Sequence, residues 1–197
     1  MEDNLFLILD YGLGNVGSVK NALSKLGIKV IISAKSDDIK NCSAIIIPGV
    51  GSFDEGIIQM KTKGVFDLII TAAKDKPILG ICLGMQLLFE SSEESILGKR
   101  GLSLIPGKVL AFDSTNYTVP HVGWNSVITK DFEEKDFYFV HSYYCEPVNE
   151  ENILGTTNVF NKTFCSMVRV NNVFGVQFHP EKSGPAGLNV LQKFINF

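Results

Sequence analysis

The sequence predicts a mixed α/β fold in which a mainly parallel central sheet is extended by antiparallel strands. Strand-like and helix-like segments alternate in the first half of the chain, whereas short strand-like segments follow one another in the second half. No repeat, low-complexity segment or long linker divides residues 1–197, so we expect a single domain. A length of 197 residues with 45% hydrophobic side chains is enough to bury a substantial core.

The first half has the pattern of successive βαβ units. Short apolar runs predict buried strands at residues 5–9, 29–33, 44–48 and 77–81. Apolar residues at helical spacing predict helices at residues 16–27, 54–61, 65–74 and 84–91. Because strands and helices alternate, these strands are expected to run parallel.

The second half has the pattern of antiparallel strands added to that parallel core. Strands are expected at residues 107–112, 124–129, 137–144, 153–160, 166–170 and 173–178. The pair Asn171-Asn172 suits a tight hairpin turn between the last two of them. A helical pattern over residues 186–197 completes the chain.

The composition excludes several classes of partner. A formal charge of −3, from 18 basic and 21 acidic residues, provides no basic field for nucleic acid. No apolar stretch approaches the roughly 18 residues of a spanning helix, and the first residues lack the positive segment of a secretory signal. We therefore expect a cytoplasmic protein that binds neither nucleic acid nor a membrane.

The four cysteines do not form a metal-binding or disulfide pattern. They include no CxxC pair, and no histidine stands at ligand spacing from any of them, so zinc and disulfides are not expected. Cys42, Cys145 and Cys165 have ordinary surroundings and are interpreted as buried small side chains. Cys82 differs because glycines flank it in the sequence GICLGMQLLF.

Cys82 stands where a predicted strand meets a predicted helix. Gly80 and Gly84 bracket it as glycines bracket the nucleophile in a G-x-S-x-G elbow, where they relieve crowding in a sharp turn. The carboxyl edge of a parallel sheet is also where open α/β sheets bind ligands. The backbone N–H of Leu83 is then the natural first donor to an oxyanion. A core turn without chemistry would produce the same short pattern.

A nucleophilic cysteine needs a base and a group that orients the base. His179 lies in FHPEKS after a strongly apolar strand, and Pro180 disfavours helical geometry at His179. In an extended chain Glu181 would point to the same side as His179 and could fix its tautomer. The alternative is a surface histidine beside a solvated glutamate.

The loop PGVG at residues 48–51 follows another predicted strand and reaches the same sheet edge. Its glycines allow the backbone to approach a ligand, so we expect Val50 or Gly51 to provide a second oxyanion donor. The alternative is a glycine-rich connection with no such role.

Together these motifs resemble the class I glutamine amidotransferases. The resemblance rests on GICLGMQLLFE, on PGVGSF upstream and on GVQFHPEKS downstream. Three further stretches, DYGLGN, PHVGWN and FVHSYY, are similar to the branch that supplies glutaminase subunits to imidazole glycerol phosphate synthases. Other branches usually carry histidine where this chain has Met85.

The resemblance implies a three-layer, flavodoxin-like fold and specific roles for the site residues. Cys82 would attack the side-chain amide of L-glutamine to give a thioester and ammonia, with His179 moving protons and Glu181 orienting it. No cofactor or metal is implied. The family positions that contact the bound glutamine match Gln86 and the backbone of Ser142 and Tyr143. For Gln86, an exposed helix amide is the alternative.

The resemblance also implies a partner. In this family ammonia passes to a separate (β/α)8 cyclase subunit, which forms imidazole glycerol phosphate and AICAR in histidine biosynthesis. No cyclase barrel fits within this chain, so a heterodimer of two polypeptides is expected. Family interface positions match Asn15, Trp124, Tyr138 and Lys182. For Trp124, a buried core position is the alternative.

Other functions remain open at this point. A paralogous glutaminase could feed ammonia to another acceptor, such as an amidino-sugar pathway of surface glycans. A cysteine peptidase would share the elbow but would not need GMQ, PGVG and HPEKS together, and an inactive binding module would be expected to lose a triad residue. His121 is predicted to make structural or interface hydrogen bonds and His141 to support the pocket wall, with no catalytic proton transfer by either. DYGLGN lacks the spacing of a nucleotide-binding fingerprint.

Overall fold

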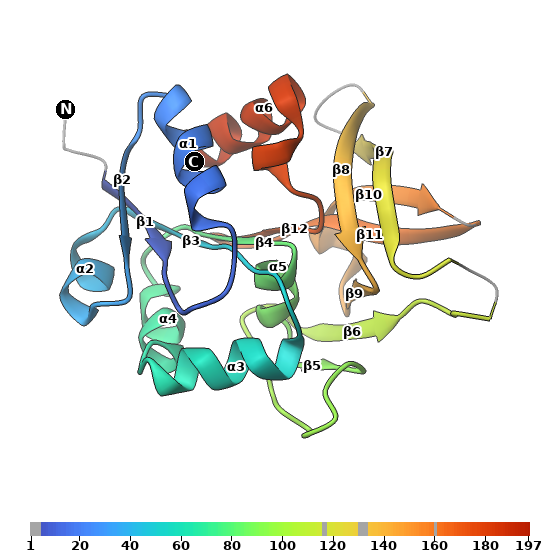
Figure 1. The fold of residues 1–197 in the computed structure, drawn as a ribbon, viewed down its shortest axis with the longest axis horizontal. Coiled ribbons are helices and arrows are strands. Elements are labelled where there is room, and N and C mark those ends of the chain that lie inside the picture. The colour runs from blue at the N-terminus through green and yellow to red at the C-terminus, as the bar shows by residue number, and fades with distance from the viewer. Residues whose placement is uncertain (1–4, 116–117, 130–133, 160) are drawn as a thin grey trace.

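The computed structural model describes residues 5–115, 118–129, 134–159 and 161–197. Figure 1 shows helices on both sides of a central sheet, with a group of antiparallel strands at one end. The parallel part of the sheet has the predicted strands side by side. In spatial order these are β2 (Lys29–Ser33), β1 (Leu5–Leu9), β3 (Ala44–Ile47), β4 (Ile78–Ile81) and β12 (Val173–Val176).

The second half of the chain extends this sheet with antiparallel strands. Beyond β12 the order continues through β11 (Lys162–Val170), β10 (Ile153–Val159), β7 (His121–Thr129) and β8 (Lys135–His141). A side branch consists of β9 (Tyr143–Pro147), β6 (Gly107–Ala111) and β5 (Ser91–Ser92). The predicted fold class, a mainly parallel sheet with added antiparallel strands, is confirmed.

Strand β12 joins the two parts of the sheet, which the sequence pattern did not reveal. It was predicted as one more added antiparallel strand, but it runs parallel to β4 on one side and antiparallel to β11 on the other. The predicted hairpin between β11 and β12 is present, and Asn171 adopts a φ of 52° in its turn. As a result, the end of β12 lies beside the end of β4.

The helices form two layers. On one face α1 (Val16–Lys25) and α6 (Gly184–Ile195) pack on the sheet, where their apolar side chains join one buried cluster. The helices of the other face contribute to a second cluster: α2 (Ser36–Asn41), α3 (Phe53–Thr62), α4 (Phe66–Ala72) and α5 (Leu83–Leu87). Among the helices in the described ranges, none has the length and apolar character needed to span a membrane.

Several boundaries differ from the sequence prediction. Helix α2 was missed because its sequence SDDIKN contributes only Ile39 to the core. The expected strand 137–144 is broken at Ser142, which separates β8 from β9. The expected helix 84–91 ends at Leu87, and residue 160 of the expected strand 153–160 lies outside the described part of the chain. Short 3-10 helices also occur at Glu150–Asn152 and Pro180–Lys182.

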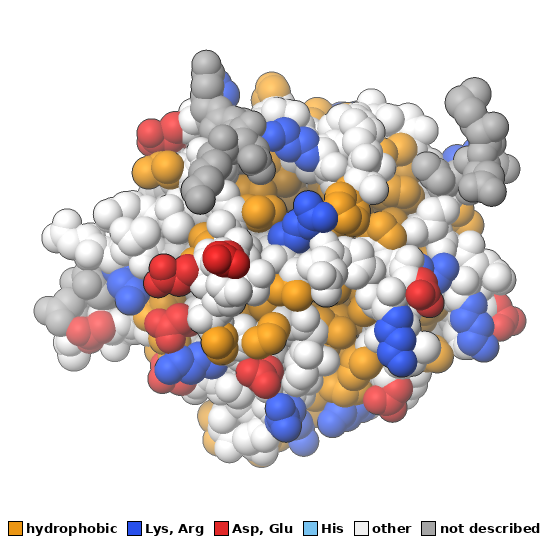
Figure 2. All heavy atoms as spheres, turned by 180° about the vertical axis from the view of Figure 1, so that it is seen from behind, with side chains coloured by type: hydrophobic (Ala, Val, Ile, Leu, Met, Phe, Trp, Pro, Cys, Tyr) orange, Lys and Arg blue, Asp and Glu red, His pale blue; other side chains and the backbone are white. Residues whose placement is uncertain are grey.

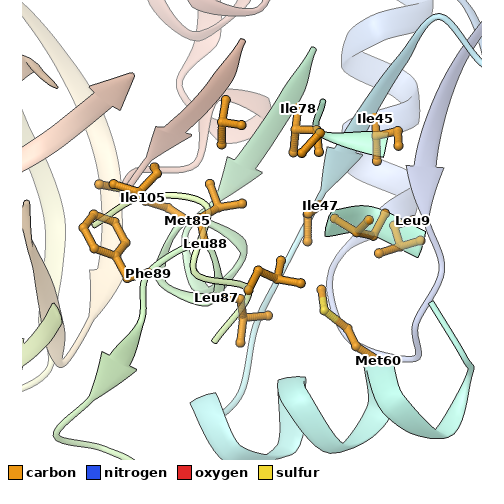
Figure 3. Packing of buried hydrophobic residues seen from close by; sticks show 14 of the residues in the cluster. Leu9, Ile45, Ile47, Met60, Ile78, Met85, Leu87, Leu88, Phe89 and Ile105 are labelled. Carbon is orange, nitrogen blue, oxygen red and sulfur yellow. The ribbon is translucent and has the colours of Figure 1, made fainter. Parts of the chain in front are cut away.

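Helix α5 is held in place mainly by packing. Figure 3 shows Met85, Leu87 and Leu88 among side chains from the sheet and from α3. All three are fully buried, and burial of such side chains contributes roughly 1.5–3 kcal/mol each. A helix of only five residues would not form alone, so this packing fixes the turn that precedes it.

Candidate active site

Cys82 lies on a strained turn between β4 and α5. Its φ of 56° and ψ of −112° place a residue that has a Cβ in a region that favours glycine. The flanking glycines are required sterically, because a Cβ on Gly84 would collide with the carbonyl oxygen of Ile47 and one on Gly80 with that of Gly84. The Cys82 N–H donates to the Val176 carbonyl at 2.8 Å, which ties the turn to β12. The predicted elbow geometry is present.

His179 and Glu181 form a buried pair directly after β12. His179 Nδ1 and Glu181 Oε1 are 2.8 Å apart, and the side chains are 3% and 2% exposed, which excludes a solvated surface pair. The reason given for their proximity was wrong: Glu181 does not continue an extended strand but lies in a 3-10 turn, Pro180–Lys182. Because β12 and β4 are parallel neighbours, His179 and Cys82 reach the same sheet edge.

The surroundings of His179 favour its charged form. Burial alone would lower the pKa of His179, but the neighbouring Cys82 sulfur and the Glu181 carboxylate raise it to about 9. An imidazolium held between a sulfur and a carboxylate can stabilise a thiolate. His179 can therefore carry a proton at neutral pH and donate it to a leaving group.

A cavity of about 240 Å³ lies beside the cysteine and the histidine. Every residue predicted to contact the substrate or its oxyanion lines it: Val50, Gly51, Leu83, Gln86, Ser142 and Tyr143. The PGVG loop approaches the elbow closely, since a Cβ on Gly49 would lie 2.6 Å from the backbone nitrogen of Gly84. The cavity is small, polar in part and lined by Cys82 and His179, which suits a small metabolite.

Gln86 is buried in the wall of this cavity. It is 4% exposed, and its Nε2 donates to the Tyr143 carbonyl oxygen at 3.2 Å. This bond links α5 to the corner between β8 and β9, where Ser142 and Tyr143 face the cavity. The alternative of an exposed helix amide is excluded.

Glu94 is a cavity residue that the sequence did not indicate. Its Oε2 accepts the Phe53 N–H at the start of α3 at 2.7 Å, and burial raises the pKa of its carboxyl. Nothing in the polar run SSEES singles out this glutamate, because only the packing of that loop against α3 brings it to the cavity. Pro120 and Val140 also line the cavity and had not been predicted.

His121 and His141 form a structural pair, as predicted. His121 Nδ1 and His141 Nε2 are 2.9 Å apart, and His141 Nδ1 is 2.7 Å from the Tyr143 carbonyl oxygen. Since a carbonyl can only accept, His141 Nδ1 carries the proton. Burial lowers the pKa of His141 to about 3 and also lowers that of His121, so both are neutral. The two histidines fix the backbone at the corner between β8 and β9.

Three of the four predicted interface residues lie together on the surface. Trp124 is 55% exposed, so the alternative of a core position is wrong. Its ring is 6.1 Å from that of Tyr138, and the Lys182 Nζ lies 5.7 Å from the centre of the Tyr138 ring. We refer to these three side chains as the aromatic patch. Asn15 instead caps helix α1 by accepting the Ser18 N–H at 3.1 Å.

The fold and this site define a class I glutamine amidotransferase. The family model described as "Glutamine amidotransferase class-I" matches residues 7–197. The chain is 44% identical over 203 residues to imidazole glycerol phosphate synthase subunit HisH of Chlorobaculum tepidum, covering 98% of this chain and 100% of that one. The chain therefore belongs to this amidotransferase family and, within it, to the HisH subunits.

A longer relative agrees with this assignment, and a solved structure agrees with the fold. Imidazole glycerol phosphate synthase hisHF of Arabidopsis thaliana is 42% identical over 206 residues, which cover 98% of this chain but 34% of that protein. A structure described as a glutamine amidotransferase superposes with a TM-score of 0.80 over 97% of both chains. At 17% identity that likeness supports the fold alone.

Proposed function

We propose that this chain is the glutaminase subunit of an imidazole glycerol phosphate synthase, in which it hydrolyses L-glutamine to glutamate and ammonia. One observation carries the proposal: a strained cysteine, a buried histidine–glutamate pair and the Gln86–Tyr143 corner face one small cavity. Membership among the HisH subunits supports the assignment of this site to glutamine.

The first half-reaction uses the groups around Cys82. The Cys82 sulfur attacks the side-chain amide carbon, and a C–S bond forms while the carbonyl oxygen gains negative charge. Leu83 N–H and an N–H of Val50 or Gly51 stabilise that oxyanion. The tetrahedral intermediate collapses when His179 protonates the amide nitrogen, the C–N bond breaks and ammonia leaves.

The second half-reaction regenerates the enzyme. Neutral His179 takes a proton from a water molecule, which attacks the thioester carbon, and the C–S bond breaks to release glutamate. Glu181 holds the imidazole and stabilises it each time it becomes charged. The balance of atoms and electrons closes without a metal or another cofactor.

Polar residues that line the cavity suit the amino-acid end of glutamine. Glu94 provides a carboxylate, and Ser142 and Tyr143 line the same cavity. Gln86 Nε2 donates hydrogen bonds to the Tyr143 carbonyl and to Gln177 Oε1. The side-chain oxygen of Gln86 is therefore the atom that can accept a hydrogen bond from a ligand. Acceptors of this kind bind an α-ammonium group.

The partner is proposed to be a separate cyclase subunit that receives the ammonia. Free ammonia is mostly protonated in neutral water and then is not a nucleophile, so direct transfer between subunits is needed. The aromatic patch and Asn15 would contact the cyclase, since an exposed Trp beside Tyr and Lys is typical of interface centres. The name of the Arabidopsis relative, hisHF, supports this pairing.

Two broader features are part of the proposal. Residues 1–197 would act as one domain, because the described strands from β2 to β8 form one connected order. A cytoplasmic location fits four free cysteines. On the face shown in Figure 2, acidic and basic side chains are interspersed, which does not favour nucleic acid as a partner.

Glutamate release from glutamine tests this function. The purified chain is assayed alone, then with the cyclase subunit of the same organism and its nucleotide substrate. A sharp rise in rate with both additions supports the proposal. If they have no effect while a thiol-trapping glutamine analogue still labels Cys82, the glutaminase chemistry stands and the ammonia goes to another acceptor. Failure of labelling as well would reject both.

A further inference from the structure

We propose that Gln177 is a further residue of the catalytic site, whose side-chain amide donates a hydrogen bond to Cys82 Sγ and stabilises the thiolate. Gln177 follows β12 directly and is fully buried. Its Nε2 lies 3.8 Å from Cys82 Sγ, within reach of the long hydrogen bonds that sulfur accepts. The inference rests on the proposed role of Cys82 as nucleophile.

The orientation of the Gln177 amide follows from its neighbours. The Tyr143 carbonyl can only accept, so the group of Gln86 that faces it at 3.2 Å is the Nε2 amide. The second N–H of that Nε2 faces Gln177 at 3.2 Å, which requires the Gln177 oxygen at that position. The Gln177 NH2 group therefore points toward the sulfur. A flipped amide would oppose two NH2 groups and direct an oxygen at the thiolate.

The hydrogen bonds that orient Gln86 and Gln177 start from the Tyr143 carbonyl oxygen. His141 Nδ1 donates to the same Tyr143 oxygen at 2.7 Å, and His141 in turn accepts from His121. The backbone N–H of Gln177 donates to the Ser166 carbonyl at 2.9 Å, which fixes the start of the Gln177 side chain. The Ser166 carbonyl thus holds the backbone of Gln177, and Gln86 orients its side-chain amide.

A buried glutamine requires partners, because an unpaired amide at such a site is costly. Position 177 lies in the apolar sequence VFGVQF, where a hydrophobic residue would pack without this requirement. In the described ranges, the side-chain partners of Gln177 are Gln86 and Cys82. The amide thus joins a substrate-contacting residue to the nucleophile, and it would also stabilise the thiolate that leaves when the thioester is hydrolysed.

The pH dependence of Cys82 alkylation by iodoacetamide tests this role, with the Cys82 peptide followed by mass spectrometry. The reagent reacts with the thiolate, so the rate profile reports how readily the charge forms. Burial raises the pKa values of Cys42 and Cys145 and raises that of Cys165 to about 12, so these thiols stay protonated. Cys82 can therefore be followed in the unmodified background.

Two variants remove the donor: Gln177→Met and the shape-conserving Gln177→Glu. For Gln177→Met the alkylation of Cys82 at neutral pH should be slower than in wild type, by up to about tenfold, because the thiolate loses a donor. Gln177→Glu should slow the alkylation further, since a carboxylate would face the thiolate. Ser166→Ala is the matched control, because it removes a buried hydroxyl whose partner is Thr157 and should leave the profile unchanged.

The outcomes separate this inference from the proposed function. A folded Gln177→Met or Gln177→Glu with the wild-type profile overturns the inference and leaves the function intact. Failure of iodoacetamide to label wild-type Cys82 would instead reject the proposed nucleophile. If the melting curve of Gln177→Met differs from that of wild type, the alkylation of Gln177→Glu is used to test the inference instead. In glutamate release, loss of the donor should lower kcat and leave KM unchanged.

Discussion

The buried triad and the aromatic patch meet at adjacent residues yet depend on opposite physical conditions. The Glu181 side chain is 2% exposed and holds a histidine 2.8 Å away, whereas its neighbour Lys182 is exposed and lies over the ring of Tyr138. Electrostatic interactions are strong where water is excluded and weak where it is present. The single turn Pro180–Lys182 thus places Glu181 against His179 and places Lys182 on the surface.

This contrast explains what each region can do. The triad needs no partner to be assembled, because packing of α5 and pairing of β12 with β4 fix its members. The aromatic patch contributes little to folding, since more than half of the Trp124 side chain remains in contact with water. Changes in the triad should therefore abolish catalysis in every assay, and changes in the patch should affect only the response to the partner.

Replacement of the nucleophile should have the largest effect. Cys82→Ala is expected to lower glutamate release by at least about four orders of magnitude, because triad members act as a unit. The variant should still bind the cyclase with unchanged affinity, since Cys82 is not part of the aromatic patch. Glutamate release and titration with the cyclase measure the two properties. Measurable turnover near the wild-type rate would remove Cys82 from the mechanism.

Loss of the carboxylate should have the next largest effect. Glu181→Gln keeps the shape of the side chain but removes the charge that stabilises the imidazolium, so kcat should fall by about a thousandfold. Asp67→Asn is a suitable control, because this exposed carboxylate lies on α4 and does not line the cavity. Equal losses in both variants would show that the effect is a general one of lost charge.

Sequence reasoning predicted the elbow because two glycines at fixed spacing around Cys82 mark it in the sequence. Gly80 leaves room for the Gly84 carbonyl, and Gly84 leaves room for the Ile47 carbonyl of β3. The same reasoning placed His179 and Glu181 together but chose the wrong backbone geometry, since Pro180 starts a 3-10 turn rather than continuing a strand. A short motif can thus predict a contact before it predicts the conformation that makes it.

The parts that sequence reasoning missed depend on long-range packing. Glu94 reaches the cavity only because its loop packs against the start of α3, and Gln177 faces Cys82 only because β12 lies beside β4. In the sequence Gln177 is one polar residue in an apolar strand, and its side chain has no local partner. Loop packing decided the position of Glu94 and strand pairing that of Gln177, and the parallel pairing of β12 with β4 was the pairing that had not been predicted.

The stability of the buried region should depend on pH. The pKa of His179 is raised to about 9 in the fold, against about 6.5 in an unfolded chain, so its contribution is complete below about pH 6.5 and is lost as pH rises through 9. We expect a loss of about 3 kcal/mol between pH 6 and pH 9.5 in wild type, measured by urea unfolding. His179→Asn should show a smaller loss, and an identical loss would contradict the assignment.

The aromatic patch should show the smallest effect, and one of a different kind. Trp124→Ala should change the free energy of unfolding by less than about 0.5 kcal/mol, because the ring is exposed. If Trp124 is an interface centre, affinity for the cyclase should fall by roughly thirtyfold, and basal glutamate release should not change. Ile128→Ala, at an exposed apolar position of the same strand β7, is the matched control. Equal losses of affinity in both variants would mean that the strand as a whole is buried by the partner, whereas unchanged affinity in Trp124→Ala would move the docking surface away from the triad turn.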